Sequence, residues 1–255
     1  MPGWATNCAT MADITDDAFL GGRLRLRQPR QGHRAGHDAM LLAASTGAKA
    51  GDRVVEFGAG VGAAGLALAT RVPGLDLVLV EIDGSLAELA RSNAASNGLA
   101  ACVMALDVAA GAPAFALAGL SPDSADVVLM NPPFNDSGQY GASPDPGRAV
   151  AHVATATTLA DWVHAARRIL KSGGALTLIW RADGLTEVLT TLERGFGGLV
   201  VQPVHARAEL PAIRMMVRAI KGSRAPLSLL PGLMIDSEAV KTALTDALAL
   251  PLAGA

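Results

Sequence analysis

A tetrapeptide near the middle of the chain, Asn131-Pro132-Pro133-Phe134, has residue types suited to holding a planar amine. An amine conjugated with a ring is a poor nucleophile because its lone pair is delocalised. The amide oxygen of Asn131 and the carbonyl of Pro132 can each accept one N–H of such an amine, which favours the pyramidal form and frees the lone pair. Proline restricts the backbone around that carbonyl, and Phe134 offers a ring face for stacking. The motif predicts chemistry on a planar amine, with Asn131, Pro132 and Phe134 as catalytic residues, whereas a simple turn with a buried ring is the structural alternative.

A glycine-rich turn earlier in the chain, Gly58-Ala59-Gly60-Val61-Gly62, predicts a ligand site. Glycines let the backbone turn tightly and let a ligand approach the main chain and the next helix terminus. The turn alone does not identify the ligand, because Gly58, Gly60 and Ala63 also fit the dinucleotide fingerprint. A nicotinamide or flavin cofactor therefore stays open at this point, as does a turn with no ligand.

The acidic residues near this turn favour S-adenosylmethionine. Glu56 can meet the ammonium group of a bound amino acid, Glu81 can accept both ribose hydroxyls, and Asp107 falls near the expected adenine ring. Structural roles are the alternatives: Asp107 suits a helix N-cap and Glu56 a buried acceptor, while Glu81 also suits a dinucleotide. The predicted cofactor-binding residues are Glu56, Gly58, Gly60, Gly62, Glu81, Ile82, Asp107, Val108 and Asn131.

Alternating strand and helix patterns must position these residues. The predicted strands are 53–57, 76–82, 101–106, 125–130 and 174–180, then 198–206 and 213–222 as an antiparallel pair; the predicted helices between them are 62–72, 84–98 and 158–170. Such an order favours parallel strands with right-handed crossovers and ligands beyond their carboxyl ends. We predict an α/β fold with a doubly wound, mainly parallel, seven-stranded sheet of the Rossmann-like kind. A strand near 21–28 and a helix over 36–48 form a small N-terminal β/α extension.

Length and composition fit one such domain. The chain has 255 residues, of which 51% are hydrophobic and 17% charged. We expect a flexible N-terminus over 1–18 and a single domain over 19–255. No apolar run reaches the about 18 residues of a membrane span, no signal peptide is evident, and Cys8 and Cys102 match no metal or redox spacing. We therefore expect a cytoplasmic protein, a monomer or weak dimer, with no membrane partner and no metal.

Basic residues are unevenly distributed although the net charge is only −2. Five arginines and no acid fall between Asp17 and Asp38, and in the segment 23–27 arginine alternates with leucine. A second basic stretch runs from 207 to 224, opposed only by Glu209. This asymmetry fits a polyanion, although solvated strand faces explain either stretch alone equally well. The predicted RNA-contacting residues are Arg23, Arg25, Arg27, Arg30, Lys221 and Arg224.

A metal site near the N-terminus is the weaker reading of three further residues. His33 and His37 are four residues apart and Asp38 follows, but no third well-spaced ligand joins them. His37 and Asp38 are better explained as the start of a helix that flanks the cofactor.

Three longer segments, RQPRQGHRAGHDAMLLAAS, NPPFND and RMMVRAIKGSRAPLSLLPGL, resemble a bacterial family of class I methyltransferases over roughly residues 20–235. That family methylates the 6-amino group of the adenine just 3′ of the anticodon in a valine tRNA. The resemblance implies a tRNA adenine-N6 methyltransferase that uses S-adenosylmethionine. Relatives that share the tetrapeptide act on guanine-N2 of ribosomal RNA or on a protein glutamine, so both remain alternatives. The long polar loop 136–147 departs from the family. A non-catalytic RNA-binding module would have no need of Asn131 and Phe134.

Overall fold

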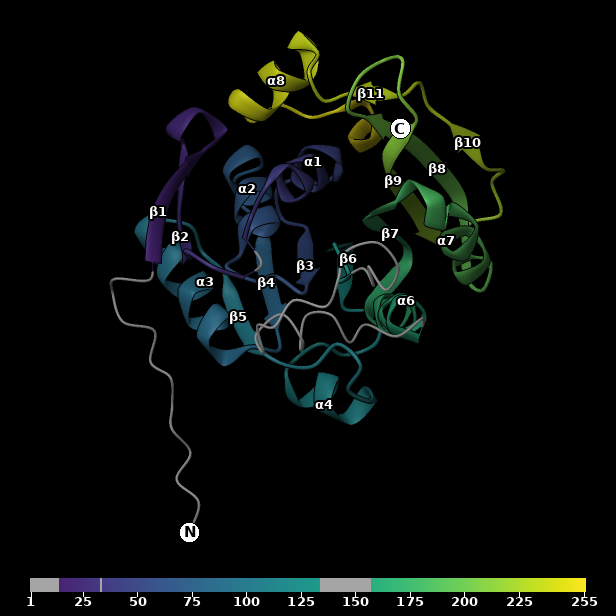
Figure 1. The fold of residues 1–255 in the computed structure, drawn as a ribbon. Helices are drawn as coiled ribbons and strands as arrows, with labels where there is room; N and C mark the ends of the chain where they lie inside the picture. The colour runs from purple at the N-terminus through teal and green to yellow at the C-terminus, as the bar shows by residue number, and fades with distance from the viewer. Residues whose placement is uncertain (1–13, 33, 134–156) are drawn as a thin grey trace.

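The computed structural model describes residues 14–32, 34–133 and 157–255 (Figure 1). The strands are β1 (Ile14–Phe19), β2 (Leu24–Pro29), β3 (Arg53–Phe57), β4 (Asp76–Glu81), β5 (Cys102–Ala105), β6 (Ala125–Met130), β7 (Leu170–Arg181), β8 (Phe196–His205), β9 (Ala212–Lys221), β10 (Ser228–Leu229) and β11 (Leu233–Met234). The helices are α1 (His37–Ser45), α2 (Ala63–Arg71), α3 (Gly84–Ser96), α4 (Ala112–Leu117), α6 (Thr157–Ile169), α7 (Leu185–Leu192) and α8 (Glu238–Thr245).

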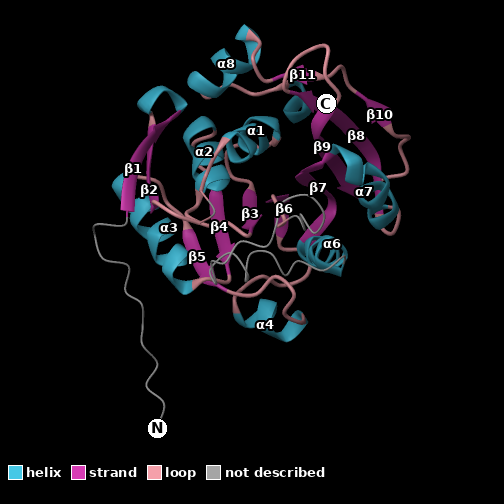
Figure 2. Cartoon of the chain, viewed as in Figure 1, coloured by secondary structure: helices cyan, strands magenta, loops and turns pink. Residues whose placement is uncertain are grey.

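One large sheet forms the centre of the molecule (Figure 2). Its strand order is β10-β8-β9-β7-β6-β3-β4-β5, with β11 also paired to β8. The strands β5, β4, β3, β6 and β7 are parallel, and β9 is antiparallel to both β7 and β8. The predicted doubly wound, mainly parallel fold is confirmed. The seven predicted strands are all present, but the sheet has nine strands. The sequence did not indicate β10 and β11, because these strands are too short to show a periodic pattern.

Both faces of the sheet are buried, because successive side chains of a strand point to opposite sides. Leu77 and Leu79 of β4 pack into a core with side chains of α1 and α2. Val78 and Val80 of the same strand pack into a second core with side chains of α4, α6 and α7. This burial on two sides explains why the strands read as continuous apolar runs.

The N-terminal extension contains more structure than its sequence indicated. β1 pairs antiparallel with β2, from Ile14 opposite Pro29 to Phe19 opposite Leu24. The prediction of a flexible segment over 1–18 is therefore wrong for residues 14–18, while residues 1–13 lie outside the described chain. The sequence did not indicate β1, because its residues are mostly polar and their burial alternates only partly along the strand. In β2 the leucines are buried and the arginines exposed, so the predicted alternation is confirmed.

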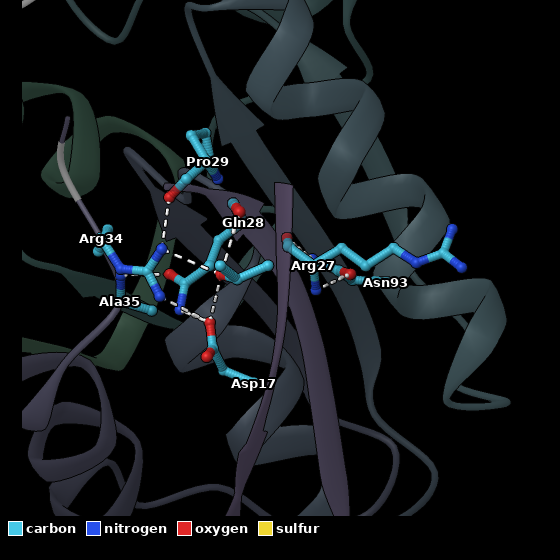
Figure 3. A network of polar contacts seen from close by, with 8 residues as sticks. Asp17, Arg27, Gln28, Pro29, Arg34, Ala35 and Asn93 are labelled. Atoms are coloured by element: carbon cyan, nitrogen blue, oxygen red, sulfur yellow. Dashed lines mark hydrogen bonds and ion pairs between the residues drawn. The ribbon is translucent and has the colours of Figure 1, made fainter. Parts of the chain in front are cut away.

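A polar network fixes the chain between this hairpin and α1 (Figure 3). The Asp17 carboxylate accepts hydrogen bonds from Gln28 Nε2, Thr15 Oγ1 and Arg34 Nη2, each at 2.7 Å. Gln28 Oε1 in turn accepts from the Ala35 N–H at 2.8 Å. The hydrogen bonds from Gln28 and Thr15, with the charge of Arg34, hold the pKa of Asp17 below its usual value. The segment that leads into α1 is thus tied to both strands of the hairpin.

The C-terminal region packs against the end of α1 and the start of β2. The Leu250 N–H donates to the Ala44 carbonyl at 2.8 Å, and Arg23 Nη1 donates to the Thr245 carbonyl at 2.7 Å. In the described part of the chain, no helix has the length and apolar character needed to cross a bilayer.

The packing of β2 generates a stability prediction. Leu26 of β2 is completely buried beneath its strand. Leu26→Ala should therefore lower the free energy of unfolding by about 2–4 kcal/mol, because it removes apolar burial and leaves a cavity. Arg25→Ala is the control, because this neighbour is exposed and forms only a surface ion pair with Asp16, a loss of less than about 1 kcal/mol. Urea unfolding of both variants measures the difference, and equal small losses would mean that the hairpin is not packed on the domain.

Candidate active site

Strand register brings two of the predicted polar residues to one edge of the sheet. Phe57, the last residue of β3, lies opposite Val80 of β4 on one side and Met130 of β6 on the other. Glu81 and Asn131 are each the next residue along their strands, so both flank the start of the glycine loop at Gly58. The carboxyl edge of the parallel strands is therefore the candidate site, as the sequence predicted.

The glycine loop needs its glycines. Gly58, Gly60 and Gly62 have φ of 64°, 56° and 87°, in the left-handed region that favours glycine. A Cβ on Gly58 would also lie 2.5 Å from the indole of Trp162. A Cβ on Gly60 would meet nothing within 4 Å, so the backbone there faces open space that a ligand can approach.

Glu56 lies buried beneath this loop, with only 5% of its surface exposed. Its Oε2 accepts the Gly65 N–H, in the first turn of α2, at 2.7 Å. Burial raises the pKa of Glu56 to about 8, and the charge of Glu81 raises it further, although the Gly65 and Ala64 N–H groups oppose the shift. The hydrogen bond fits the structural role foreseen for Glu56. An ammonium group close to Glu56 would favour its ionised carboxylate and so oppose the rise in its pKa. The predicted contact of Glu56 with the cofactor stays a prediction.

Glu81 connects the second strand end to the glycine loop. Its Oε2 accepts the Gly60 N–H at 2.7 Å and its Oε1 accepts the Asp83 N–H at 2.9 Å. Each carboxylate oxygen keeps a further lone pair for a ligand hydroxyl. The next residue, Ile82, has 63% of its surface exposed, which is unusual for a large apolar side chain and suits contact with a flat ring.

Asp107 and Val108 follow the third strand. Asp107 is exposed, and its Oδ1 accepts the Ala109 N–H at 2.8 Å, so that it stabilises a turn. The structural alternative of a helix N-cap is wrong, because the N-cap of the next helix, α4, is Gly111. Val108 is buried. Contact of either residue with an adenine ring stays a prediction.

Asn131 carries the observation most relevant to chemistry. Its Oδ1 is buried and has no hydrogen-bond partner among the residues that the structure describes. Buried polar atoms are nearly always paired, so this oxygen is an acceptor suited to a donor on a ligand. Pro132 is buried and Pro133 half-buried beside it. Phe134 lies outside the described residues, and so does the loop 136–147.

The second basic stretch is divided between the two edges of the large sheet. Because β9 is antiparallel to β7, Arg214 lies opposite Arg181 at the carboxyl end of β7, whereas Ile220 lies opposite Ala175 near its amino end. Lys221 accordingly lies at the amino edge of the sheet, where its Nζ donates to Asp123 Oδ1 at 2.7 Å.

Arg224 lies at the same amino edge, because its backbone nitrogen is beside Gly197 at the start of β8. RNA contact by Lys221 and Arg224 stays a prediction that requires a substrate long enough to span both edges.

Three residues near the site were not singled out from the sequence for this role. Trp162 of α6 packs on Gly58 and stacks edge-on against Phe57, with ring centroids 6.4 Å apart. Arg181 and Arg214 lie at the carboxyl edge, where Arg214 Nε donates to Asp38 Oδ2 at 2.9 Å. Residues 198–206 and 213–222 were predicted to form an antiparallel pair of strands. This prediction already implied the position of Arg214, because the start of the second strand in such a pair meets the carboxyl end of the first. No sequence signal indicated the contact of Trp162.

A Rossmann-like sheet with a glycine loop and the segment Asn131-Pro132-Pro133 at its carboxyl edge defines a class I methyltransferase. The chain belongs to the family described as Methyltransferase small domain, which it matches over residues 36–204.

Two curated relatives are RNA methyltransferases. The chain is 31% identical over 177 residues to the tRNA1(Val) (adenine(37)-N6)-methyltransferase of Porphyromonas gingivalis, a match that covers 68% of each chain. It is 36% identical over 85 residues to Ribosomal RNA small subunit methyltransferase C of Stutzerimonas stutzeri, which covers 33% of this chain and 23% of the relative.

Solved structures share the fold. A predicted O-methyltransferase, protein Atu636 of Agrobacterium tumefaciens, is 33% identical with a TM-score of 0.69, and the match covers 84% of this chain and 98% of the other. The 16S rRNA N2 G1207 methyltransferase of T. thermophilus, solved with AdoMet and guanosine, is 20% identical with a TM-score of 0.54, over 82% of this chain and 50% of the other. The second likeness concerns the fold alone.

S-adenosylmethionine is the cofactor of this chain, and the described residues fit it. The open backbone at Gly60 and the exposed Ile82 leave space for it beside the Glu81 carboxylate. Among the described residues, no three His, Cys, Asp or Glu side chains are grouped so that they could bind a metal ion.

The buried carboxyl of Glu56 predicts a pH dependence of stability. A carboxyl whose pKa rises on folding from 4.5 to about 8 contributes stability below pH 4.5 that is lost as the pH rises through about 8. The cofactor-free protein should therefore lose about 2–4 kcal/mol of unfolding free energy between pH 5 and pH 9. Glu56→Gln keeps an acceptor for the Gly65 N–H but cannot ionise, so its profile should be flatter. Urea titrations across this pH range test it, and parallel profiles for the two proteins would contradict the burial of Glu56.

Removing the Glu81 carboxylate should weaken cofactor binding. Glu81→Ala removes the acceptor of the Gly60 N–H and of the expected ribose hydroxyls, a loss of about 1.5–3 kcal/mol in binding. Asp83→Ala is the matched control, because this acid caps α3 and its loss should cost about 1 kcal/mol of stability with little effect on the cofactor. Calorimetry with S-adenosylmethionine measures both. Equal affinities in the two variants would exclude Glu81 from the cofactor site.

Proposed function

We propose that this chain transfers a methyl group from S-adenosylmethionine to the 6-amino group of an adenine in tRNA, beside the anticodon of a valine tRNA. The observation that carries the proposal is the buried amide oxygen of Asn131, which has no partner among the described residues. The match to the tRNA1(Val) methyltransferase of P. gingivalis over most of both chains supports tRNA as the substrate. An RNA partner also agrees with the cytoplasmic location that we expect.

In the proposed reaction the chain mainly positions the amine. Asn131 Oδ1 and the Pro132 carbonyl accept its two N–H bonds, so that the nitrogen becomes pyramidal and its lone pair points at the methyl group. S-adenosylmethionine supplies that methyl group on a positively charged sulfur. When the nitrogen takes up the methyl group, the sulfur of the bound cofactor would keep the electron pair of the C–S bond. The extra proton on the nitrogen then leaves to water, so no dedicated base is needed. Phe134 is proposed to stack on the base.

Guanine-N2 of ribosomal RNA is the second candidate acceptor, because relatives that share the tetrapeptide act on it and the S. stutzeri relative is a ribosomal RNA methyltransferase. That match covers a third of this chain and less than a quarter of the relative, so it supports the alternative less than the tRNA match supports adenine. A protein glutamine carries an NH₂ group of the same kind and is a third outcome to test.

Incubation with labelled cofactor separates these acceptors. The wild-type protein should be offered unmodified tRNA, ribosomal RNA and total protein, and the labelled RNA digested to nucleosides. Label in N6-methyladenosine from the tRNA is expected. Label in a guanosine from ribosomal RNA, or in protein with none in tRNA, would overturn the proposal.

Asn131→Ala should lower turnover by about 100-fold or more, because it removes one of the two acceptors that act on the amine in the transition state. Cofactor affinity and fold should change little. Asn131→Asp, which keeps an acceptor at the same place, should retain more turnover than Asn131→Ala. Near wild-type turnover in Asn131→Ala would mean that the tetrapeptide is only a turn.

A further inference from the structure

One buried side chain connects the glycine loop with the N-terminal hairpin. Asn93 of α3 has no exposed surface. Its Oδ1 accepts the Arg27 N–H at 2.8 Å, and its Nδ2 donates to the carbonyls of Arg27 and Val61, each at 3.0 Å. Arg27 belongs to β2 and Val61 to the glycine loop, so a single amide group bonds both elements (Figure 3 draws the Arg27 bond).

Asn97, one turn further along α3, makes the comparable bonds without touching the loop. Its Oδ1 accepts the Arg25 N–H at 2.9 Å, its Nδ2 donates to the Arg25 carbonyl at 2.7 Å, and the same Nδ2 reaches the Asn93 carbonyl in its own helix. The spacing of i and i+4 on a helix, about 6 Å, matches two residues along a strand, about 6.6 Å. Both asparagines therefore dock β2 on α3, and only Asn93 also holds the loop.

β2 has two ends that differ in their charged partners. At the far end, Arg23 Nη1 donates to the Thr245 carbonyl at 2.7 Å and lies 3.4 Å from Asp246. In the middle, Arg25 forms an ion pair with Asp16 at 3.2 Å. These two arginines are thus committed to α8 and β1, although the alternating sequence makes them look equivalent to Arg27.

The end of β2 beside the glycine loop is positively charged and exposed. Arg34 is paired there with Asp17 at 2.7 Å, which neutralises both. Arg27 is exposed, and Figure 3 shows its guanidinium extending away from the network around Asp17. The positive charge of Arg27 therefore lies on the strand that Asn93 connects to the glycine loop.

We propose that Asn93 is a positioning residue for both ligands and that Arg27 binds the phosphate backbone of the RNA substrate. By holding Arg27 and Val61 at once, Asn93 keeps this surface at a fixed distance from the cofactor loop, and hence from the methyl group that the RNA must reach. This inference rests on the proposed function for the identity of the substrate. The positioning of the loop by Asn93 does not depend on it.

The first experiment compares Asn93→Ala with Asn97→Ala. Both variants remove an amide that docks the same strand, but only Asn93→Ala leaves the Val61 carbonyl without its partner. The affinity for S-adenosylmethionine should fall by about tenfold in Asn93→Ala and change by less than about twofold in Asn97→Ala. Calorimetry measures binding, and circular dichroism with a thermal melt checks the fold. If Asn93→Ala does not fold, Asn93→Ser, which keeps a hydroxyl in the smaller space, is measured instead. Equal cofactor affinities in the two members of the pair would overturn the positioning role.

The second experiment tests the RNA surface. Arg27→Gln is compared with Arg194→Gln, which removes the same charge from an exposed residue that precedes β8 at the amino edge. The first variant should bind tRNA about tenfold more weakly and lower the slope of log affinity against log salt by up to about 0.7–0.9 per lost phosphate contact. The control should keep both values, and cofactor affinity should be unchanged in each.

The outcomes of this test separate the two proposals. Wild-type protein that methylates tRNA, together with a hairpin variant that binds tRNA like the control, would overturn the RNA surface and leave the proposed function standing. Wild-type protein that labels no RNA would overturn the proposed function and this surface with it, while the Asn93 comparison would still decide the positioning role.

Discussion

The parallel pairing of β3 between β4 and β6 is the constraint on which the site depends. Because these strands end in register at Phe57, Val80 and Met130, the residues that follow them meet at one edge. Glu81 then reaches Gly60 in the loop after β3, and Asn131 begins the tetrapeptide on the other side. Residues that are far apart in the chain thus become neighbours because the backbones of their strands pair.

The site keeps polar atoms in places that folding alone would not favour. Glu56 is buried beneath a loop of left-handed glycines, where burial raises its pKa to about 8, and Asn131 Oδ1 is buried without a partner among the described residues. Both features cost free energy in the cofactor-free protein. A ligand that brings a positive charge near Glu56 and N–H donors to Asn131 would remove these costs. Such a ligand is what a methyltransferase that acts on amines binds.

The N-terminal hairpin illustrates how tertiary contacts sort residues that look alike. The alternation of leucine and arginine in β2 indicated a half-exposed strand, and the buried Leu24 and Leu26 agree with it. The same pattern gave no reason to separate Arg23 from Arg27. Their difference comes from elements distant in the chain, α8 at one end and α3 with the glycine loop at the other. The hydrogen bonds of Asn93 make the hairpin part of the site.

Local sequence was sufficient for the alternating strands and helices, the glycine loop and the order of Glu56, Glu81 and Asn131, because apolar periodicity and glycine conformation act over a few residues. It could not reveal β1, whose polar residues become a strand only by pairing with β2, nor the packing of Trp162 on Gly58. It also gave no sign that the basic stretch 207–224 is divided between the two edges of the sheet. The antiparallel direction of β9 separates Arg214 from Lys221, since strand direction decides which end of a segment reaches the carboxyl edge. Partners and direction are set by contacts across the whole chain, and these exist only in the folded structure.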